Sequence, residues 1–515
     1  MKRWIHRLGC LGLSMAAALA PLAAETNLPP VTSKAARLFP YYSGVIIPPN
    51  FAPLNFKIEE PGQRYRVRIH AAQGNPIEIA SRSPGVVIPP QPWRAMLQAN
   101  AGSNIFVDIS VKNQASGWIQ FATITNTVAR EPIDGHLVYR LLKPLYNMYV
   151  NLGIYQRDLS TYKESVVLHN RSFQHWCVNC HTFLNHQPEP MALHIRSESG
   201  GHPMLLVQSN EVTKVIRTAG YMSWHPSGRL IAYSANKLSL LYHTVGETRD
   251  VYDAESNLGI YRVDQNRIVI PPAIARRDRQ ETWPSWSPDG KHLYFCSAPV
   301  LPPERLKEIR YDLMRIPYDL EKDVWGEVET MVSTRETGLS TAQPRVSPDG
   351  RFLLFCMFKY GSFPIYQPSS DLYLMTLTNR QFRRLEINSP EADTWHCWSS
   401  NGRWIVFSSK RRDGLFARPY FSYCDGEGRF SKPVILPQED PAFYDSFIKT
   451  YNLPELIQGP VRVKERDLAE AIFKPRKVLR PALDTNAPPQ APSVGEADGD
   501  AGEPYYRPGP KEKAP

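Results

Sequence analysis

Hydrophobic and polar residues alternate strictly along three stretches in the N-terminal part of the chain. These stretches are Arg64–His70, Ile105–Val111 and Trp118–Ile124, and clusters of Gly, Asn, Pro and Ser separate them. Alternation with a period of two is typical of a β-strand that has one buried face. Such strands bury that face by packing against one another, so residues 51–130 are predicted to form a small β-sandwich-like domain.

A strand–turn–strand pattern recurs four times in the C-terminal half of the chain. Each copy joins two apolar segments through a turn that ends in glycine and a basic residue, and the aligned glycines are Gly228, Gly290, Gly350 and Gly402. The second and third copies contain Pro-Asp-Gly, which favours a tight turn because proline restricts φ and glycine tolerates positive φ. Long repeats built from several strands predict a β-propeller, whose blades pack radially.

The four copies resemble the WD40-like, PD40-type repeat of the TolB-type periplasmic family, with its core W-S-P-D-G-[KR]-x-[IL]-x-[FY]. The copy that starts at Trp286 matches closely, whereas the fourth has Ser400 and Asn401 in place of Pro-Asp. The resemblance implies a TolB-like propeller over residues 201–455. Segments near Met204 and Tyr420 are expected to supply a fifth and a sixth blade, with five blades as the alternative. The resemblance implies a fold and no particular activity.

The remaining segments are interpreted from composition. Residues 25–50 are rich in proline and are interpreted as an irregular leader, and residues 131–200 lack clean alternation. Residues 456–515 are predicted to be a C-terminal extension, with a short helix over Leu468–Lys477. From Asn486 this extension lacks apolar residues, so its end is predicted to be disordered. The predicted fold class is therefore mainly β.

A C-x-x-C-H run, Cys177–His181, lies within residues 131–200. This run is the attachment signature of c-type haem. Two thiols add to the porphyrin vinyl groups and must project from one short segment, and the histidine that follows gives its imidazole to the iron. Cys177, Cys180 and His181 are thus predicted to hold one covalent haem c, with His181 as the proximal ligand. A disulfide, a redox C-x-x-C or a zinc half-site is the alternative.

The second axial position of the iron has several candidates. His194 is the first choice because it lies thirteen residues beyond His181 in an apolar stretch, far enough along the chain to pass the ring edge. Met191 and His202 are the alternatives, and an open position is a further one. The choice matters because axial ligands shift the haem potential over ~0.8 V.

The first 24 residues have the organisation of an export signal. Lys2, Arg3 and Arg7 precede an apolar stretch from Leu8 to Ala20, and small residues follow before Glu25. The apolar stretch is shorter than the ~20 residues that span a bilayer. Residues 1–24 are therefore predicted to be a cleaved signal peptide, which predicts a periplasmic protein without a transmembrane segment after signal removal.

Charge and cysteine content add two expectations. The 515 residues carry a net charge of +10, but the basic residues are dispersed and no recognition motif accompanies them, so no nucleic-acid partner is predicted. A basic surface suits a redox partner protein of opposite charge in the periplasm. Of the seven cysteines, Cys10 lies in the predicted signal peptide. The four others outside the motif are predicted to be buried structural thiols, and they are Cys296, Cys356, Cys397 and Cys424.

The whole chain resembles exported proteins that join a TolB-like propeller to one C-x-x-C-H segment. The predicted order is a β-sandwich over 51–130, a haem attachment segment over 131–200 and a five- or six-bladed propeller over 201–455. The leading hypothesis is a periplasmic monohaem c-type cytochrome that transfers electrons. The alternatives are a haem enzyme that binds a small substrate at an open distal site, and a non-redox interaction or sensor protein.

Overall fold

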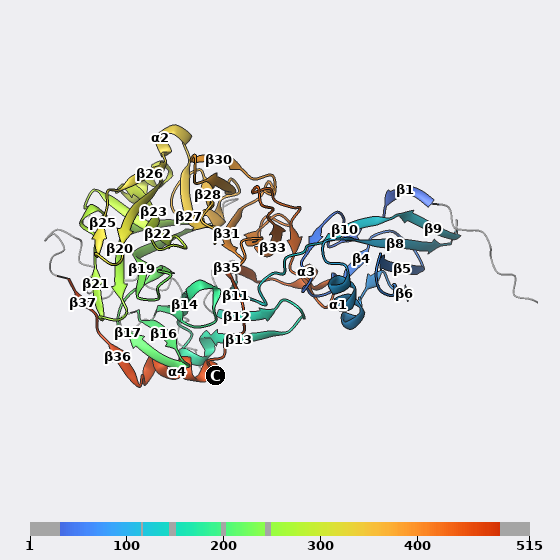
Figure 1. Cartoon of the computed structure of the whole chain (residues 1–515), viewed down its shortest axis with the longest axis horizontal. Coiled ribbons are helices and arrows are strands. Elements are labelled where there is room, and N and C mark those ends of the chain that lie inside the picture. The colour runs from blue at the N-terminus through green and yellow to red at the C-terminus, as the bar shows by residue number, and fades with distance from the viewer. Residues whose placement is uncertain are drawn as a thin grey trace, which may run out of the picture.

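A β-sandwich and a larger β-propeller lie side by side along the long axis of the molecule (Figure 1). The computed structural model describes residues 31–114, 117–143, 151–196, 202–242, 249–274 and 276–484. No helix in these ranges is long and apolar enough to cross a membrane. The predicted signal peptide and the predicted disordered tail from Asn486 lie outside the described residues.

The sandwich consists of a seven-stranded sheet and a three-stranded sheet that share one core. The larger sheet contains β1 (Val31–Ala35), β3 (Ile46–Ile47), β5 (Arg64–Ala71), β6 (Ile77–Ser81), β8 (Asn104–Asn113), β9 (Gly117–Ala122) and β10 (Ile124–Val128). The smaller sheet contains β2 (Leu38–Phe39), β4 (Phe56–Ile58) and β7 (Gly85–Val86). Along β5, Tyr65, Val67 and Ile69 are buried and alternate with exposed residues, so the alternation correctly predicted the strand.

The sandwich begins earlier than the pattern predicted. Leu38, Tyr42 and Val45 lie in the segment interpreted as an irregular leader, yet they are buried in the sandwich core. The prolines interrupt regular strand pairing there, but the apolar residues between them are still buried in the core. A helix that alternation did not predict, α1 (Pro90–Ala99), buries Trp93, whose Nε1 donates to Phe51 O at 3.1 Å.

The propeller has six blades, each a sheet with one strand innermost. Blade 1 contains β35 (Thr450–Ile457), β11 (His136–Leu142), β12 (Gly153–Asp158) and β13 (Glu164–His169). Blade 2 contains β14 (Cys177–Phe183), β15 (Met191–Arg196), β16 (Met204–Gln208) and β17 (Glu211–Val215). Blade 3 contains β18 (Gly220–Trp224), β19 (Leu230–Tyr242), β20 (Arg249–Arg262) and β21 (Arg267–Val269).

The other three blades contain the second, third and fourth sequence repeats. Blade 4 contains β22 (Arg279–Trp286), β23 (His292–Pro299), β24 (Asp312–Asp319), β25 (Val324–Trp325) and β26 (Glu329–Val332). Blade 5 contains β27 (Ser340–Val346), β28 (Phe352–Phe358), β29 (Asp371–Thr376) and β30 (Gln381–Arg384). Blade 6 contains β31 (Asp393–Trp398), β32 (Trp404–Ser409), β33 (Arg418–Tyr423) and β34 (Val434–Ile435).

Blades 1 and 2 correct the predicted division of the chain. The propeller begins at His136 instead of residue 201, because residues 136–196 supply strands of these two blades. Met204 lies in the third strand of blade 2, and Tyr420 lies in the third strand of blade 6, so the region around Tyr420 adds no blade of its own. Blades 1 and 2 lack the glycine turn of the repeat, which is why the repeat pattern did not reveal them.

The C-terminal part of the chain closes the ring. β35 pairs antiparallel with β11 and so becomes the innermost strand of blade 1. Beyond it, α4 (Glu465–Phe473) packs on the outside of blades 1 and 2. β36 (Lys477–Leu479) and β37 (Ala482–Leu483) then extend the outer edges of blades 2 and 3. Residues 456–484 therefore run along the outside of blade 2, which contains the C-x-x-C-H run.

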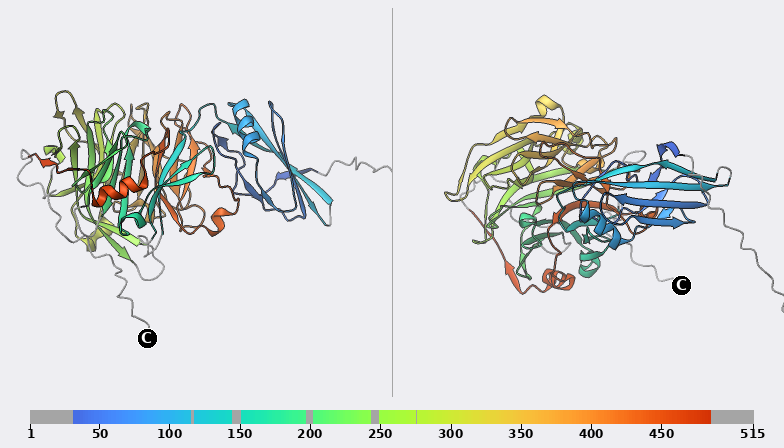
Figure 2. Two further views of the ribbon diagram at one scale, coloured as in Figure 1. Left: turned by 90° about the horizontal axis from the view of Figure 1, so that it is seen from below. Right: turned by 45° about the vertical axis from the view of Figure 1, so that its right-hand side comes forward.

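The sandwich is joined to blade 6 through side-chain contacts and a shared core. Figure 2 shows the sandwich at the rim of the propeller disc, next to this blade. Trp404 Nε1 donates to Glu131 O at 3.0 Å, and Ser400 N donates to Asp134 Oδ2 at 2.7 Å. Trp404 and Phe421 of blade 6 belong to the same buried cluster as the sandwich residues. The two parts therefore form one continuous hydrophobic core.

The four repeat glycines occupy equivalent turns, as the sequence predicted. Their φ angles are +73° at Gly228, +71° at Gly290, +73° at Gly350 and +67° at Gly402. In the fourth turn Asn401 takes the role of the aspartate, because its Oδ1 accepts hydrogen bonds from Ser399 Oγ at 2.7 Å and from Arg403 N at 3.0 Å. The turn without Pro-Asp therefore keeps the same geometry.

Gly290→Ala is expected to destabilise the propeller more than Gly350→Ala. Both changes place a Cβ in the left-handed region, which costs about 1–2 kcal/mol. At Gly290 the new Cβ would also lie 2.4 Å from His225 Nε2 and disturb the bond of that nitrogen to Gly290 O, whereas no atom lies within 4 Å at Gly350. The free energy of unfolding in urea measures both losses, and equal losses would contradict the predicted contact.

Candidate cofactor site

Every innermost strand of the propeller contains a two-residue bulge where its pairing with the next strand shifts. The shifts are bounded by Val178/His181, Gly220/Ser223, Thr282/Ser285, Ala342/Arg345, Thr394/Cys397 and Asn452/Glu455. In five strands the first bulged residue has a positive φ, at Tyr221, Trp283, Gln343, Trp395 and Leu453. Left-handed conformations of such residues are costly and cluster at functional sites. The bulges therefore mark the centre of the propeller as a candidate site.

The C-x-x-C-H run supplies the bulge of blade 2. Asn179 and Cys180 are the two residues without a partner in the register, and His181 resumes pairing opposite Leu193. Cys180 therefore occupies the position that Met222 has in blade 3 and His396 has in blade 6. The motif lies in a strand that lines the propeller axis.

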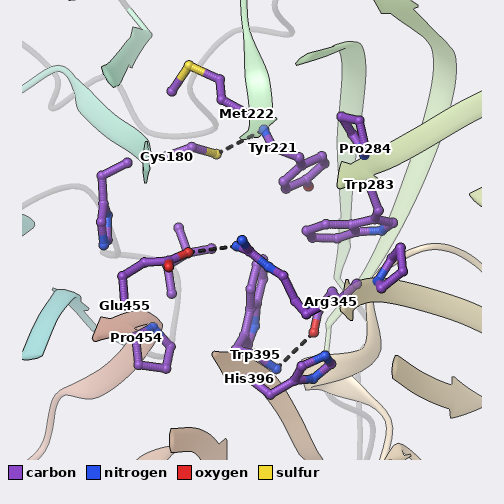
Figure 3. A pocket seen from close by; sticks show the side chains of 14 residues that line it. Cys180, Tyr221, Met222, Trp283, Pro284, Arg345, Trp395, His396, Pro454 and Glu455 are labelled. Carbon is purple, nitrogen blue, oxygen red and sulfur yellow. Dashed lines mark hydrogen bonds and ion pairs between the residues drawn. The ribbon is translucent and has the colours of Figure 1, made fainter. Parts of the chain in front are cut away.

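A pocket, here called the channel pocket, lies beside Cys180 on the propeller axis, and residues from all six innermost strands line it. Figure 3 shows Cys180 on one side of this channel pocket and an aromatic group on another. The Tyr221 and Trp283 rings stack at 3.6 Å between centroids, and Trp395 meets Trp283 edge-on at 5.1 Å. The cavity volume is about 40 Å³, which is room for a few water molecules and well below that of a small-molecule site.

The two motif cysteines are buried free thiols. Burial raises the pKa of both thiols, and the nearby charges of Arg140 and Arg196 partly oppose that rise. Tyr221 N donates to Cys180 Sγ at 3.4 Å, across the boundary between blades 2 and 3. Cys177 contacts the core between blades 1 and 2, whereas Cys180 contacts the core between blades 2 and 3. The four other cysteines of the described residues are also buried free thiols, as predicted.

His181 is the least satisfied polar side chain of the pocket. It is 4% exposed, and among the described residues neither Nδ1 nor Nε2 makes a hydrogen bond of normal geometry, although the Val138 backbone lies close enough to act on the ring. Burial lowers the pKa of His181 to about 4, although the Glu455 carboxylate acts in the opposite direction. The imidazole is therefore neutral at pH 7 and keeps a lone pair, which is the form that binds a metal.

The three candidates for the second axial position lie on or beside β15 and β16. His194 is fully buried, the His202 backbone acts on its ring, Asn179 Nδ2 lies 3.4 Å from its Nδ1, and its Nε2 makes no hydrogen bond of normal geometry to a described residue. Because His181 pairs with Leu193, His194 projects from the opposite face of the blade. Met191 is buried and pairs with Phe183, and His202 is partly buried just before β16. None of the three is placed across a ring plane from His181.

An ion pair and two tryptophans of the pocket escaped the sequence reasoning. Arg345 Nη2 donates to Glu455 Oε1 at 2.6 Å, and Cys397 Sγ donates to Glu455 Oε2 at 3.3 Å. The aromatic bulge residues Trp283 and Trp395 each lie three positions before a repeat tryptophan, Trp286 and Trp398. That constant offset is a signal that would have identified the channel-lining positions.

No protein-family model and no curated protein matches the chain. Among solved structures, a 6-phosphogluconolactonase-like protein from Bacteroides uniformis is 12% identical, with 65% of this chain and 93% of that chain covered and a TM-score of 0.33. An oligogalacturonate lyase in complex with manganese is 14% identical, with 63% and 87% covered and a TM-score of 0.32. A chain of a nidogen/laminin complex is 8% identical, with 63% and 100% covered and a TM-score of 0.37. The assignment of strands to blades depends on the strand order of the chain itself.

Proposed function

We propose that this chain is a periplasmic c-type cytochrome whose single haem is attached to Cys177 and Cys180 and bound through His181. The observation that carries the proposal is the position of the C-x-x-C-H run at a bulge lining the propeller axis, with His181 buried and neither of its nitrogens hydrogen-bonded in normal geometry to a described residue. The N-terminal export signal supports the location, because c-type haem is attached outside the cytoplasm in bacteria. A redox protein of that compartment is the proposed partner.

The residue types of the donor set are those that hold a covalent haem, although the folded chain directs Cys177 and Cys180 into different interblade cores. Leaving a buried polar group without a partner costs about 1–3 kcal/mol, and binding to iron would satisfy one nitrogen of His181. The two thiols are free and close enough for the charge of Cys180 to raise the pKa of Cys177. His194 stays our proposed distal ligand because its Nε2 is also buried without a hydrogen bond of normal geometry to a described residue.

The residues of this chain would perform four tasks around that group. A bound haem supplies a one-electron iron centre. Cys177 and Cys180 anchor it covalently, and neutral His181 offers its lone pair without first losing a proton. Strands from six blades line the channel pocket and would surround the group. The surrounding blades hold these groups in place, as electron transfer with little rearrangement requires.

The channel pocket also favours a second candidate function, a haem enzyme. Arg345 and Glu455 lie in the same pocket as His181, and the Nε1 of Trp395 and the Nε2 of Gln343 are buried donors without partners. These groups would orient a small substrate beside an iron with an open position.

Absorption spectra of the purified holoprotein distinguish the two functions. For electron transfer we expect a low-spin, six-coordinate spectrum that cyanide does not alter. His194→Ala is expected to convert it to a high-spin, cyanide-sensitive spectrum with the haem still attached, while His202→Ala serves as the matched variant. A high-spin spectrum in the wild-type protein would support the enzyme, and absence of haem would refute both.

A further inference from the structure

The outer face of the seven-stranded sheet of the sandwich carries a group of cations. Along β5, Arg64, Arg66 and Arg68 are exposed and alternate with residues buried in the core, so all three project from the outer face. Lys112 of β8 lies directly opposite Arg64 in the register and projects from the same face. Like charges that lie directly opposite each other destabilise a sheet, so the fold itself gains nothing from this pair.

Acidic residues balance only part of this face. Glu78 is paired with Arg68 at 3.6 Å, and Asp108 is paired with His70 at 3.0 Å. Three cations form no ion pair with a described residue, and we call them the basic patch: Arg64, Arg66 and Lys112. The basic patch therefore has charge available for an anionic partner.

Two apolar side chains adjoin the basic patch. Trp118 of β9 lies directly opposite Lys112, and the Arg66 guanidinium carbon lies 4.2 Å from the centroid of its indole ring. Val31 of β1 is 66% exposed and lies opposite Gln120, which is on the same face of β9 as Trp118. Figure 1 shows β9 at the end of the sandwich that is furthest from the propeller. Cations mixed with an indole and an aliphatic side chain are typical of a surface that lies at a bilayer interface.

We propose that the basic patch, together with Trp118 and Val31, binds the surface of a bilayer that contains anionic phospholipids. The choice of occupant follows from charge complementarity, because phosphate groups of lipid headgroups are strong acceptors for guanidinium and ammonium donors. An acidic protein or polysaccharide would match the charges alone, whereas a bilayer interface also accommodates the exposed Val31. The inference concerns the sandwich and does not depend on the cofactor of the propeller.

Flotation of the full-length protein with lipid vesicles tests this inference. We expect binding to vesicles of phosphatidylcholine mixed with phosphatidylglycerol, weakened by added salt, and little binding to phosphatidylcholine alone. Replacing all three residues of the basic patch by glutamine is expected to raise the lipid concentration for half-binding by roughly tenfold to a hundredfold, because each cation near an anionic surface contributes about fivefold. Val31→Ser keeps the charges and is expected to raise that concentration several-fold, because an apolar contact is lost.

The matched control replaces three exposed cations outside the sandwich by glutamine, namely Arg335, Lys359 and Arg462. This variant loses the same charge and is expected to bind as the wild-type protein does. Equal half-binding concentrations for the two triple variants would overturn the inference, as would equal binding of the wild-type protein to the two kinds of vesicle. An unchanged value in Val31→Ser would also overturn it, because the charges would then act without a bilayer contact. None of these outcomes bears on haem attachment, so the proposed function is tested separately.

Discussion

Replacing Cys177 and Cys180 together by alanine is expected to abolish covalent haem attachment. Each thioether needs one thiol, so either single variant should retain weakened attachment, and the double variant should retain none. Staining for haem peroxidase activity after denaturing electrophoresis measures this directly, because only covalently bound haem stays with the chain.

Cys356→Ala is the matched control for the double variant. Cys356 is likewise a buried free thiol in a propeller strand, but it lies in β28 and outside the motif. Its replacement should leave the haem stain at the wild-type level. A double variant that stains as strongly as the Cys356→Ala protein would exclude Cys177 and Cys180 as the attachment points.

Truncation after Lys449 is expected to abolish cooperative folding of the propeller. The truncation removes β35, so blade 1 loses its innermost strand and β11 is left with an unpaired edge at the axis. Tyr451, Leu456 and Ile457 are almost fully buried, and their loss removes roughly 5 kcal/mol of apolar burial. That amount is comparable with the whole stability of many domains.

Truncation after Asp484 is the control, because it removes only residues beyond the described part of the chain. Urea unfolding followed by tryptophan fluorescence should show a cooperative transition for the protein that ends at Asp484. The protein that ends at Lys449 should show none. A cooperative transition with the wild-type midpoint in the protein truncated after Lys449 would show that β35 does not close the ring.

Local signals in the sequence predicted the parts of the fold that repeat. Blades 3 to 6 share a turn in which one glycine has a positive φ, and that requirement is visible at Gly290 and Gly350 without any structure. Blade 1 has no such signal, because its innermost strand comes from a segment more than 300 residues beyond its second strand, β11. Pairing between such distant segments leaves no short-range pattern. Residues 31–50 were wrongly predicted to be an irregular leader, because their prolines interrupt the pattern of apolar residues that are buried in the core.

The sequence predicts the chemistry of the candidate site but not its position in the fold. The spacing of Cys177, Cys180 and His181 is a local property, so the sequence predicts the attachment chemistry on its own. Their position at the propeller axis depends on the six blades closing, and Arg140 and Glu455 approach them from blade 1. The predicted distal ligand His194 depends on the register between β14 and β15, which composition cannot supply.

The intact mass of the denatured wild-type protein tests the central claim most directly. The full-length chain should be exported by a bacterial host that attaches c-type haem, and then purified and unfolded before measurement. We predict the mass of residues 25–515 plus one haem, with the added mass on the peptide that contains Cys177 and Cys180. A mass without haem, or a disulfide between these two cysteines, would contradict a c-type haem in the propeller channel.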